Sequence, residues 1–183
     1  MTNVHQLLSV KPNIPVRTAT SQDNILLARQ GLETFEQAFA AQNTPEDMAA
    51  YLAGTFSPEL QAAELADPHN LFWLIYTTEV PVGYVKISTG AAAACLTQVK
   101  ALKIARFYLL QVCCSQGIGS AVLRQVQHYA RKNGFASVWL TVWEHNPAAL
   151  ALYQKLGFKM VGDEDFVLGQ DVQHDFVMDK KLI

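Results

Sequence analysis

The sequence predicts an α+β domain, with helices gathered in its first third and strands mixed with helices in the rest. Apolar residues recur at helical spacing up to about residue 66, whereas the apolar runs that follow are short and rich in β-branched and aromatic residues. The 183 residues are 50% hydrophobic, and they contain no repeat and no Ser/Pro-rich linker, so one core is expected. We expect residues 14–183 to form this single domain after a flexible lead-in at residues 1–13.

The first elements follow from their start signals. A strand is expected at residues 14–19. Thr20 or Ser21 can then cap a helix that runs to about residue 41. Its apolar face is expected to hold Ile25, Ala28, Leu32, Phe35 and Phe39.

Two proline motifs predict the next two helices. In Thr44-Pro45-Glu46-Asp47 and Ser57-Pro58-Glu59, a capping hydroxyl precedes a proline and acidic residues, which favours a helix start. The β-rich runs at residues 71–78 and 82–88, joined by a short connection at 79–81, predict a hairpin. Residues 90–98 are expected to form a loop.

The remainder is expected to alternate strands and helices. The expected order is a strand at 101–110, a helix from 118 closed by Asn133-Gly134, a strand at 136–143, a helix from Asn146-Pro147 to Gly157, and strands near 158–161 and 172–182.

Composition excludes several classes of protein. The formal net charge is −2, which argues against a dedicated nucleic-acid binder. The N-terminus lacks a signal-peptide pattern, and the longest apolar runs are too short to cross a bilayer. Cys95, Cys113 and Cys114 form no CxxC pair, so neither a zinc site nor a thioredoxin-like motif is indicated, and a reducing cytoplasm is expected. We expect no nucleic-acid or membrane partner.

The segment Phe107–Val122, FYLLQVCCSQGIGSAV, is typical of a strand, a short turn and the start of a helix. Gly117 and Gly119 would let a ligand approach the backbone, and a helix N-terminus offers unpaired N–H groups that suit a pyrophosphate. The segment is neither a dinucleotide fingerprint nor a P-loop, because Val122 replaces a small residue and Gly-Lys-Ser/Thr is absent. Alone, the two glycines fit a simple strand–helix turn equally well.

The second informative stretch is WEHNPAALALYQKLGF, in which Asn146 and Tyr153 lie two helical turns apart on roughly one face. A phenol with a pKa of ~10 can donate a proton to a departing thiolate. Taken alone, the stretch also fits an asparagine that only caps the helix and a tyrosine that only packs.

Together the two stretches resemble the GCN5-related N-acetyltransferase (GNAT) superfamily. The order is the same: a strand, a Q/R-x-x-G-x-G/A loop, a helix, a strand, and then a motif that stands here as Asn146, Ala149, Tyr153, Gly157 and Phe158. The resemblance implies a mixed central sheet flanked by helices, with splayed central strands that form an acetyl-CoA groove. It implies acetyl transfer from acetyl-CoA to an amine, with no metal. The segments ETFEQAF, NTPEDMAAYL and PVGYVKI also look like bacterial spermidine/spermine N-acetyltransferases.

The resemblance further implies which residues bind the cosubstrate. The strand that matches Phe107, Tyr108 and Leu109 pairs with the pantetheine through backbone groups. The Asn matching Asn146 contacts the CoA arm, and the Tyr matching Tyr153 protonates the CoA thiolate. The loop and helix start that hold the pyrophosphate match Ser115, Gln116, Gly117, Ile118, Gly119 and Ser120.

Three positions depart from the family pattern. Cys114 stands at the motif's Gln or Arg, Ser115 at the Gly that often follows, and Gln111 at a common Pro. Backbone N–H groups would therefore carry more of the phosphate contact, and a weaker affinity for CoA is expected. Cys113 and Cys114 are open to two interpretations, a redox-sensitive pair or small apolar residues at a strand end.

Acetyl transfer also needs a base, because a free alkylamine has a pKa near ~10.4 and only the neutral amine attacks. Two positions that hold a base in related enzymes are Ala105 and Thr141 here. Glu33 and Glu36 are candidates for the base and for an anionic wall beside a cationic amine, although a solvated helix face explains them too. Glu144 and His145 are further candidates for the base. The acids at 163–165 form a cluster that would attract a polyamine, although a surface turn explains them too.

We therefore expect a cytoplasmic N-acetyltransferase that acts on a small, polyamine-like primary amine by direct attack in a ternary complex. Backbone N–H groups near Leu109 would stabilise the oxyanion. Two alternatives stay open: a CoA-binding regulatory module with impaired catalysis, suggested by Cys114 and Ala105, and a peptide N-terminal acetyltransferase. The sequence leaves open which amine is the acceptor and whether the chain forms a homodimer.

Overall fold

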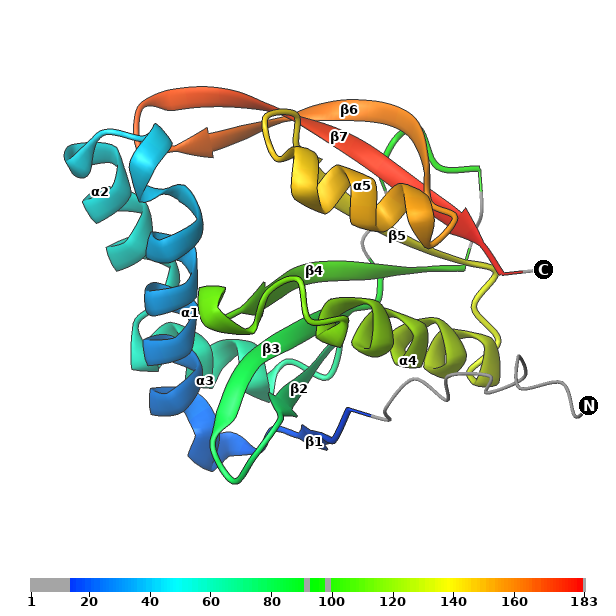
Figure 1. The fold of residues 1–183 in the computed structure, drawn as a ribbon, viewed down its shortest axis with the longest axis horizontal. Coiled ribbons are helices and arrows are strands. Elements are labelled where there is room, and N and C mark those ends of the chain that lie inside the picture. The colour runs from blue at the N-terminus through cyan, green and yellow to red at the C-terminus, as the bar shows by residue number, and fades with distance from the viewer. Residues whose placement is uncertain (1–13, 91–92, 98–99, 183) are drawn as a thin grey trace, which may run out of the picture.

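The computed structural model describes residues 14–90, 93–97 and 100–182. They form one mixed seven-stranded sheet in the order β1-β2-β3-β4-β5-β7-β6, with helices on both faces (Figure 1). The expected α+β fold is confirmed. The lead-in at residues 1–13 and part of the loop at 90–98 lie outside the described residues. No helix in the described part of the chain is long and apolar enough to cross a membrane.

The sheet is antiparallel except at its centre, where β4 and β5 run parallel. Its strands are β1 (Val16–Thr18), β2 (Asn70–Tyr76), β3 (Pro81–Ser88), β4 (Ala101–Leu109), β5 (Ser137–Trp143), β6 (Lys159–Leu168) and β7 (Asp171–Lys181). The α-helices are α1 (Asn24–Phe39), α2 (Pro45–Thr55), α3 (Pro58–Ala66), α4 (Ile118–Lys132) and α5 (Pro147–Lys155). Short 3-10 turns cover Ser21–Asp23, Ala40–Gln42 and Gln111–Cys113.

The starts of α2 and α3 are those that the capping residues predict, whereas Thr20 precedes a 3-10 turn and α1 begins only at Asn24. The Thr44 hydroxyl accepts a hydrogen bond from the Asp47 amide at 3.2 Å, and the Ser57 hydroxyl accepts one from the Leu60 amide at 3.2 Å. Each cap is followed by a proline at the first helical position. These starts are confirmed because a hydroxyl and a proline act within a few residues of themselves.

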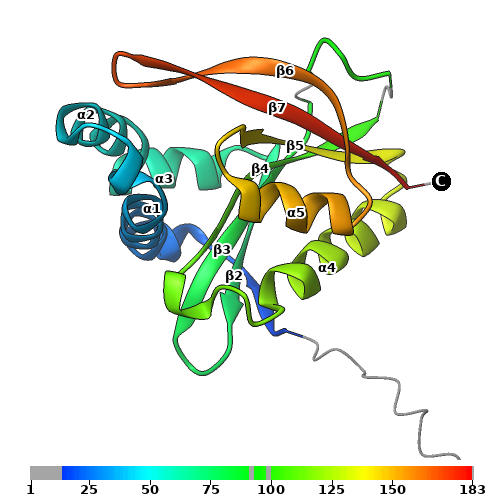
Figure 2. The ribbon, with the colours of Figure 1, turned by 45° about the horizontal axis from the view of Figure 1, so that its top comes forward.

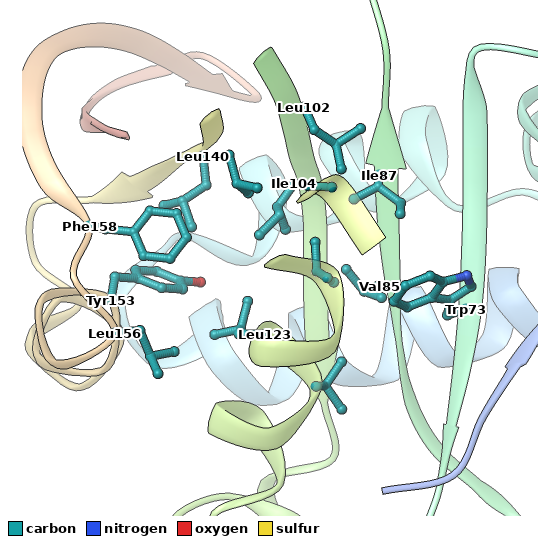
Figure 3. Close-up of a cluster of buried hydrophobic side chains, with 14 of the residues drawn as sticks. Trp73, Val85, Ile87, Leu102, Ile104, Leu123, Leu140, Tyr153, Leu156 and Phe158 are labelled. Carbon is teal, nitrogen blue, oxygen red and sulfur yellow. The ribbon is translucent and has the colours of Figure 1, made fainter. Parts of the chain in front are cut away.

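The two faces of the sheet carry different helices, as Figures 1 and 2 show together. On one face, Leu27 of α1 packs with Phe72, Leu74 and Tyr84 of β2 and β3. On the other face, α4 and α5 bury a larger apolar cluster against the strands, part of which is drawn in Figure 3. The site described below lies where these two layers meet at the centre of the sheet.

The expected apolar face of α1 is wrong in part. Ile25 and Leu32 are 68% and 42% exposed. The buried face instead includes the polar residues Gln30 and Thr34. The Gln30 amide donates to the Pro81 carbonyl at 2.7 Å, so a tertiary hydrogen bond offsets part of the cost of burying this polar side chain.

The acidic cluster at residues 163–165 does not form a turn. It lies inside β6, where Asp163, Glu164 and Asp165 pair with Phe176, Asp175 and His174 of β7. The β6–β7 pairing continues to Asp171, so the hairpin is longer than the expected strand at 158–161 allowed.

Candidate functional site

The site begins with a gap between the two parallel strands. β4 and β5 pair only through Ala101, Leu102 and Lys103, although β4 stays paired with β3 as far as Leu109. The Leu110 amide donates to the Val82 carbonyl at 2.9 Å. Because hydrogen bonding alternates along an antiparallel ladder, the amide of Leu109 must point the other way, into the gap. The splayed central strands expected from the sequence are confirmed.

A cleft of about 700 Å³ opens at this gap. Its walls come from α1 and α2, from β3 to β7, and from α4 and α5. Of the residues expected to bind the cosubstrate, the cleft is lined by Phe107, Tyr108, Leu109, Ser115, Gly117, Gly119, Ser120 and Asn146. The same cleft therefore joins the strand segment, the glycine turn and the start of α5, which are far apart in the sequence.

The glycine turn is shaped for close backbone approach. Gly117 caps α4 with φ 83°, and Ser115 has φ 61°, a conformation that L-residues rarely adopt. The first turn of α4 carries no acidic residue, and its leading amides have no acceptor within the helix, which favours an anion there. Gln116 and Ile118 can contribute only through the backbone, because the Gln116 amide donates to the Val112 carbonyl at 2.7 Å and Ile118 is in the core.

The start of α5 places Asn146 and Tyr153 on the cleft. The Asn146 side-chain oxygen accepts from the Ala149 amide at 3.1 Å, so Asn146 caps the helix and also lines the cleft. Tyr153 is only 8% exposed, and burial raises the pKa of its hydroxyl to about 12. In Figure 3 its ring lies beside Phe158 and its hydroxyl points away from α5 towards the sheet. The phenol is therefore protonated at neutral pH. Tyr153 is also one of the residues that line the cleft.

Aromatic side chains form one wall of the cleft. They come from five different elements and include Phe35, Phe39, Tyr51, Tyr108, Trp143 and Phe166. Neighbouring rings in this aromatic wall lie 4.5 to 6.2 Å apart between centroids. Tyr51 and Phe166 were not singled out by the sequence, because α2 and the β6–β7 hairpin meet only in the folded chain.

Three charged residues, Glu64, Lys86 and Arg106, form an ion-pair cluster beside the cleft. Glu64 of α3 is 2.8 Å from the ammonium of Lys86 and accepts a hydrogen bond from Arg106 at 3.0 Å. Burial opposes ionisation of Glu64, but the hydrogen bonds and charges of Arg106 and Lys86 outweigh it and lower its pKa. Lys86 and Arg106 share the Glu64 carboxylate and line the cleft, and the charge of Asp67 also acts on Lys86.

Asp175 of β7 is a site residue that the sequence analysis missed. It lines the cleft and is 8% exposed, and its Oδ1 atom has no hydrogen-bond partner among the described residues. Burial, reinforced by the charge of Glu164, raises the pKa of the carboxyl to about 6, against a hydrogen bond from Thr141 and the charges of His174 and Lys103. β7 also carries Asp171 and Asp179, so nothing in the sequence distinguishes Asp175 from its neighbours.

The candidate bases named from the sequence lie elsewhere. Glu33 and Glu36 are exposed on α1, and neither lines the cleft. Their assignment as a base or an anionic wall stays a prediction. Cys113 and Cys114 are free thiols, and Cys114 lines the cleft. Across the part of the chain that the structure describes, no group of three or more His, Cys, Asp or Glu side chains could hold a metal ion.

Comparisons with known proteins agree with this geometry. The model of the acetyltransferase (GNAT) family matches residues 32–158. An uncharacterised N-acetyltransferase of Lactobacillus delbrueckii subsp. lactis is 32% identical over 82% of this chain and 87% of its own length. Another, from Mycobacterium bovis, is 28% identical over 86% of this chain and 96% of its own. The structure of the PaiA N-acetyltransferase of Thermoplasma acidophilum, in complex with coenzyme A, superposes with a TM-score of 0.73 at 21% identity, covering 93% of this chain and 99% of that one.

Proposed function

The chain belongs to the acetyltransferase (GNAT) family, and from that membership we propose that it transfers the acetyl group of acetyl-CoA to a primary amine held in the central cleft. The observation that carries the proposal is the gap between β4 and β5, since it opens an unpaired strand edge, a helix N-terminus and a buried phenol to one space. The acceptor amine would bind on the side of the cleft that the aromatic wall forms, opposite the residues expected to hold acetyl-CoA.

The residues at the gap fit acetyl-CoA, which supplies the activated acetyl group as a thioester. The leading amides of α4 and the left-handed backbone at Gly117 suit the pyrophosphate. The free edge of β4 from Phe107 to Leu109 suits the amide-bearing pantetheine arm. The Leu109 amide, which points into the gap, is placed to donate to the oxyanion that forms at the carbonyl under attack.

Tyr153 acts as the proton donor to the departing sulfur. Its raised pKa keeps the hydroxyl protonated across the physiological range, so the donor form is present whenever the thiolate leaves. Asn146 fixes the start of α5 by its cap bond, and the helix in turn sets the position of Tyr153. The Tyr153 phenol thus donates to the departing sulfur, and the Leu109 amide donates to the carbonyl oxygen. These are the two atoms that gain negative charge during the reaction.

A polyamine-like acceptor is the finer expectation from the sequence, and the charges around the cleft do not favour it. Among the described residues that line the cleft, Asp175 is the acid, whereas Lys86, Arg106 and Lys155 are cations. A chain with several ammonium groups would meet more repulsion than attraction there. A small amine with fewer charges fits the lining better.

A single assay tests the proposal against its alternatives. The protein is incubated with acetyl-CoA and a panel of monoamines, polyamines and short peptides, and thiol release is followed together with the acetylated product. The proposal expects thiol release with at least one small amine. Binding of acetyl-CoA without release for any acceptor would favour a regulatory module, and release with peptides alone would favour a peptide N-terminal acetyltransferase.

A further inference from the structure

We propose that Asp175 binds the ammonium group of the acceptor and takes its proton, and that the acceptor is a monoamine with an apolar body about the size of an aromatic ring. This inference rests on the proposed acetyl transfer and deepens it by naming the acceptor's chemistry. It also supplies the base that Ala105 and Thr141 do not provide.

The burial of Asp175 is the first step of the argument. Its side chain is more than nine-tenths buried, yet it lines the cleft and leaves Oδ1 without a hydrogen-bond partner among the described residues. A buried acceptor left unpaired is unfavourable, and more so when it is charged. A cation bound where the carboxyl lines the cleft would offset the cost of burying its charge.

The surroundings of Asp175 suit a group that exchanges a proton near neutral pH. The Thr141 hydroxyl of β5 favours the ionised carboxyl and so lowers its pKa. Four charged or titratable groups surround the Asp175 carboxyl: Glu164 on β6, His174 in the preceding position of β7, Lys103 on β4 and Tyr51 on α2. With burial as the largest effect they leave its pKa at about 6, so the carboxylate is present at pH 7 and can still carry a proton briefly.

The aromatic wall defines the rest of the acceptor. Tyr51 is part of this wall, and the charges of both Arg106 and Asp175 act on its hydroxyl. An ammonium bound at Asp175 can rest on the ring faces of the wall, which attract cations. A second ammonium farther along would approach Arg106 and Lys86, the cations that line the cleft there, whereas their partner Glu64 does not line it. The aromatic wall therefore favours an acceptor that has one positive charge and is otherwise apolar.

The proton and bond changes balance without a further reactant. The bound ammonium gives one proton to Asp175, which releases it to solvent, and the neutral nitrogen forms a bond to the thioester carbonyl carbon. The carbon–sulfur bond breaks, and the sulfur leaves with the electron pair and receives a proton from Tyr153. The nitrogen loses its second proton through Asp175 and water, and that proton restores Tyr153. The products are an acetamide, a free thiol and one proton.

Acceptor binding tests the inference independently of turnover. 2-Phenylethylamine and spermidine are titrated calorimetrically into CoA-saturated wild type, Asp175→Asn, and the matched control Asp165→Asn, an exposed acid of β6 outside the cleft. Wild type is expected to bind 2-phenylethylamine more tightly than spermidine, and Asp175→Asn to bind it at least tenfold more weakly, with the control within twofold of wild type. Equal binding by Asp175→Asn, tighter binding of spermidine, or no binding of the monoamine would overturn the inference. Thermal melting of each variant verifies that it is folded.

Turnover separates this inference from the proposed function. In wild type, kcat/KM for 2-phenylethylamine should rise as the pH passes through about 6, the pKa of the Asp175 carboxyl. We call this rise the acid limb of the pH profile. In Asp175→Asn the acid limb should disappear, and the rate should fall by 10²- to 10⁴-fold. Thiol release by wild type with the rate and the limb kept in Asp175→Asn would reject the role of Asp175 and leave the transferase intact. Binding that depends on Asp175, without thiol release for any amine, would reject the transferase and leave the amine site.

Discussion

Lys103 and Trp139 form the last backbone pair between β4 and β5, and the Lys103 ammonium lies 4.5 Å from the centroid of the Trp139 ring. Beyond this pair the two strands separate and the cleft begins. The pair thus marks the point where the continuous sheet gives way to the cleft. The same lysine also acts on Asp175, since its charge lowers the pKa of that carboxyl.

Lys103→Met is expected to move the acid limb of activity to higher pH. Removing a cation that favours the carboxylate raises the pKa of Asp175, so a higher pH is needed to ionise it. We expect a shift of under about one unit in the limb of kcat/KM. Lys100→Met is the matched control, because Lys100 lies over Phe135 and is not among the charges that act on Asp175. An unchanged limb, or one moved to lower pH, would contradict the link.

Tyr153→Phe is expected to lower kcat by roughly 10²- to 10⁴-fold, the usual effect of losing a general acid. The dissociation constant for CoA should stay nearly unchanged, because the ring and its packing against Phe158 remain. Thiol-release kinetics and CoA titration measure the two quantities. Tyr129→Phe is the control, since Tyr129 packs on Trp73 away from the cleft. An unchanged kcat in Tyr153→Phe would remove this residue from the mechanism.

Asp175→Asn is expected to stabilise the protein at neutral pH while it impairs function. The folded-state pKa of about 6 lies above the ordinary 3.8, so the folded protein holds this proton more tightly than the unfolded chain does. Wild type therefore loses stability as the pH rises from about 4 to 6, and the loss is complete above that range. Melting temperatures at pH 4 and pH 7.5 measure it. The gain of Asp175→Asn over wild type should appear at pH 7.5 and shrink at pH 4, and a gain confined to pH 4 would refute the assignment.

Ser115→Gly is expected to raise the free energy of unfolding by roughly 0.5–1 kcal/mol. Ser115 has φ 61°, which strains a residue with a Cβ and does not strain glycine. The resemblance to the family places a glycine at this position too. Ser115→Ala is the control, because it removes the hydroxyl and keeps the Cβ. Denaturant unfolding that shows equal stability for the two variants would argue that the backbone here is unstrained.

The elements that the sequence predicts well are those fixed by nearby residues. Thr44 and Ser57 define helix starts through bonds to amides three residues on, and the glycine turn and the Asn146 cap are equally local. The family resemblance added the splayed strands, which depend on partners that local patterns do not reveal.

The parts that the sequence did not predict depend on contacts between distant segments. Ile25 looks like a core residue by spacing, but α1 buries another face, on which Gln30 bonds to Pro81. Asp175 looks like an ordinary surface acid in a strand. Only the pairing of β6 with β7, and of β7 with β5, places it beside Glu164 and Thr141 in the cleft. Its importance follows from burial, which no local pattern encodes.

The most direct test of the account follows the acetyl carbon itself. Acetyl-CoA labelled with ¹³C at the carbonyl is mixed with the protein and 2-phenylethylamine, and the amide is measured by NMR while free thiol is counted. The account predicts labelled amide and free thiol in equal amounts, with no label retained on the protein. Thiol released without labelled amide, or label left on a protein side chain, would contradict direct transfer in the cleft.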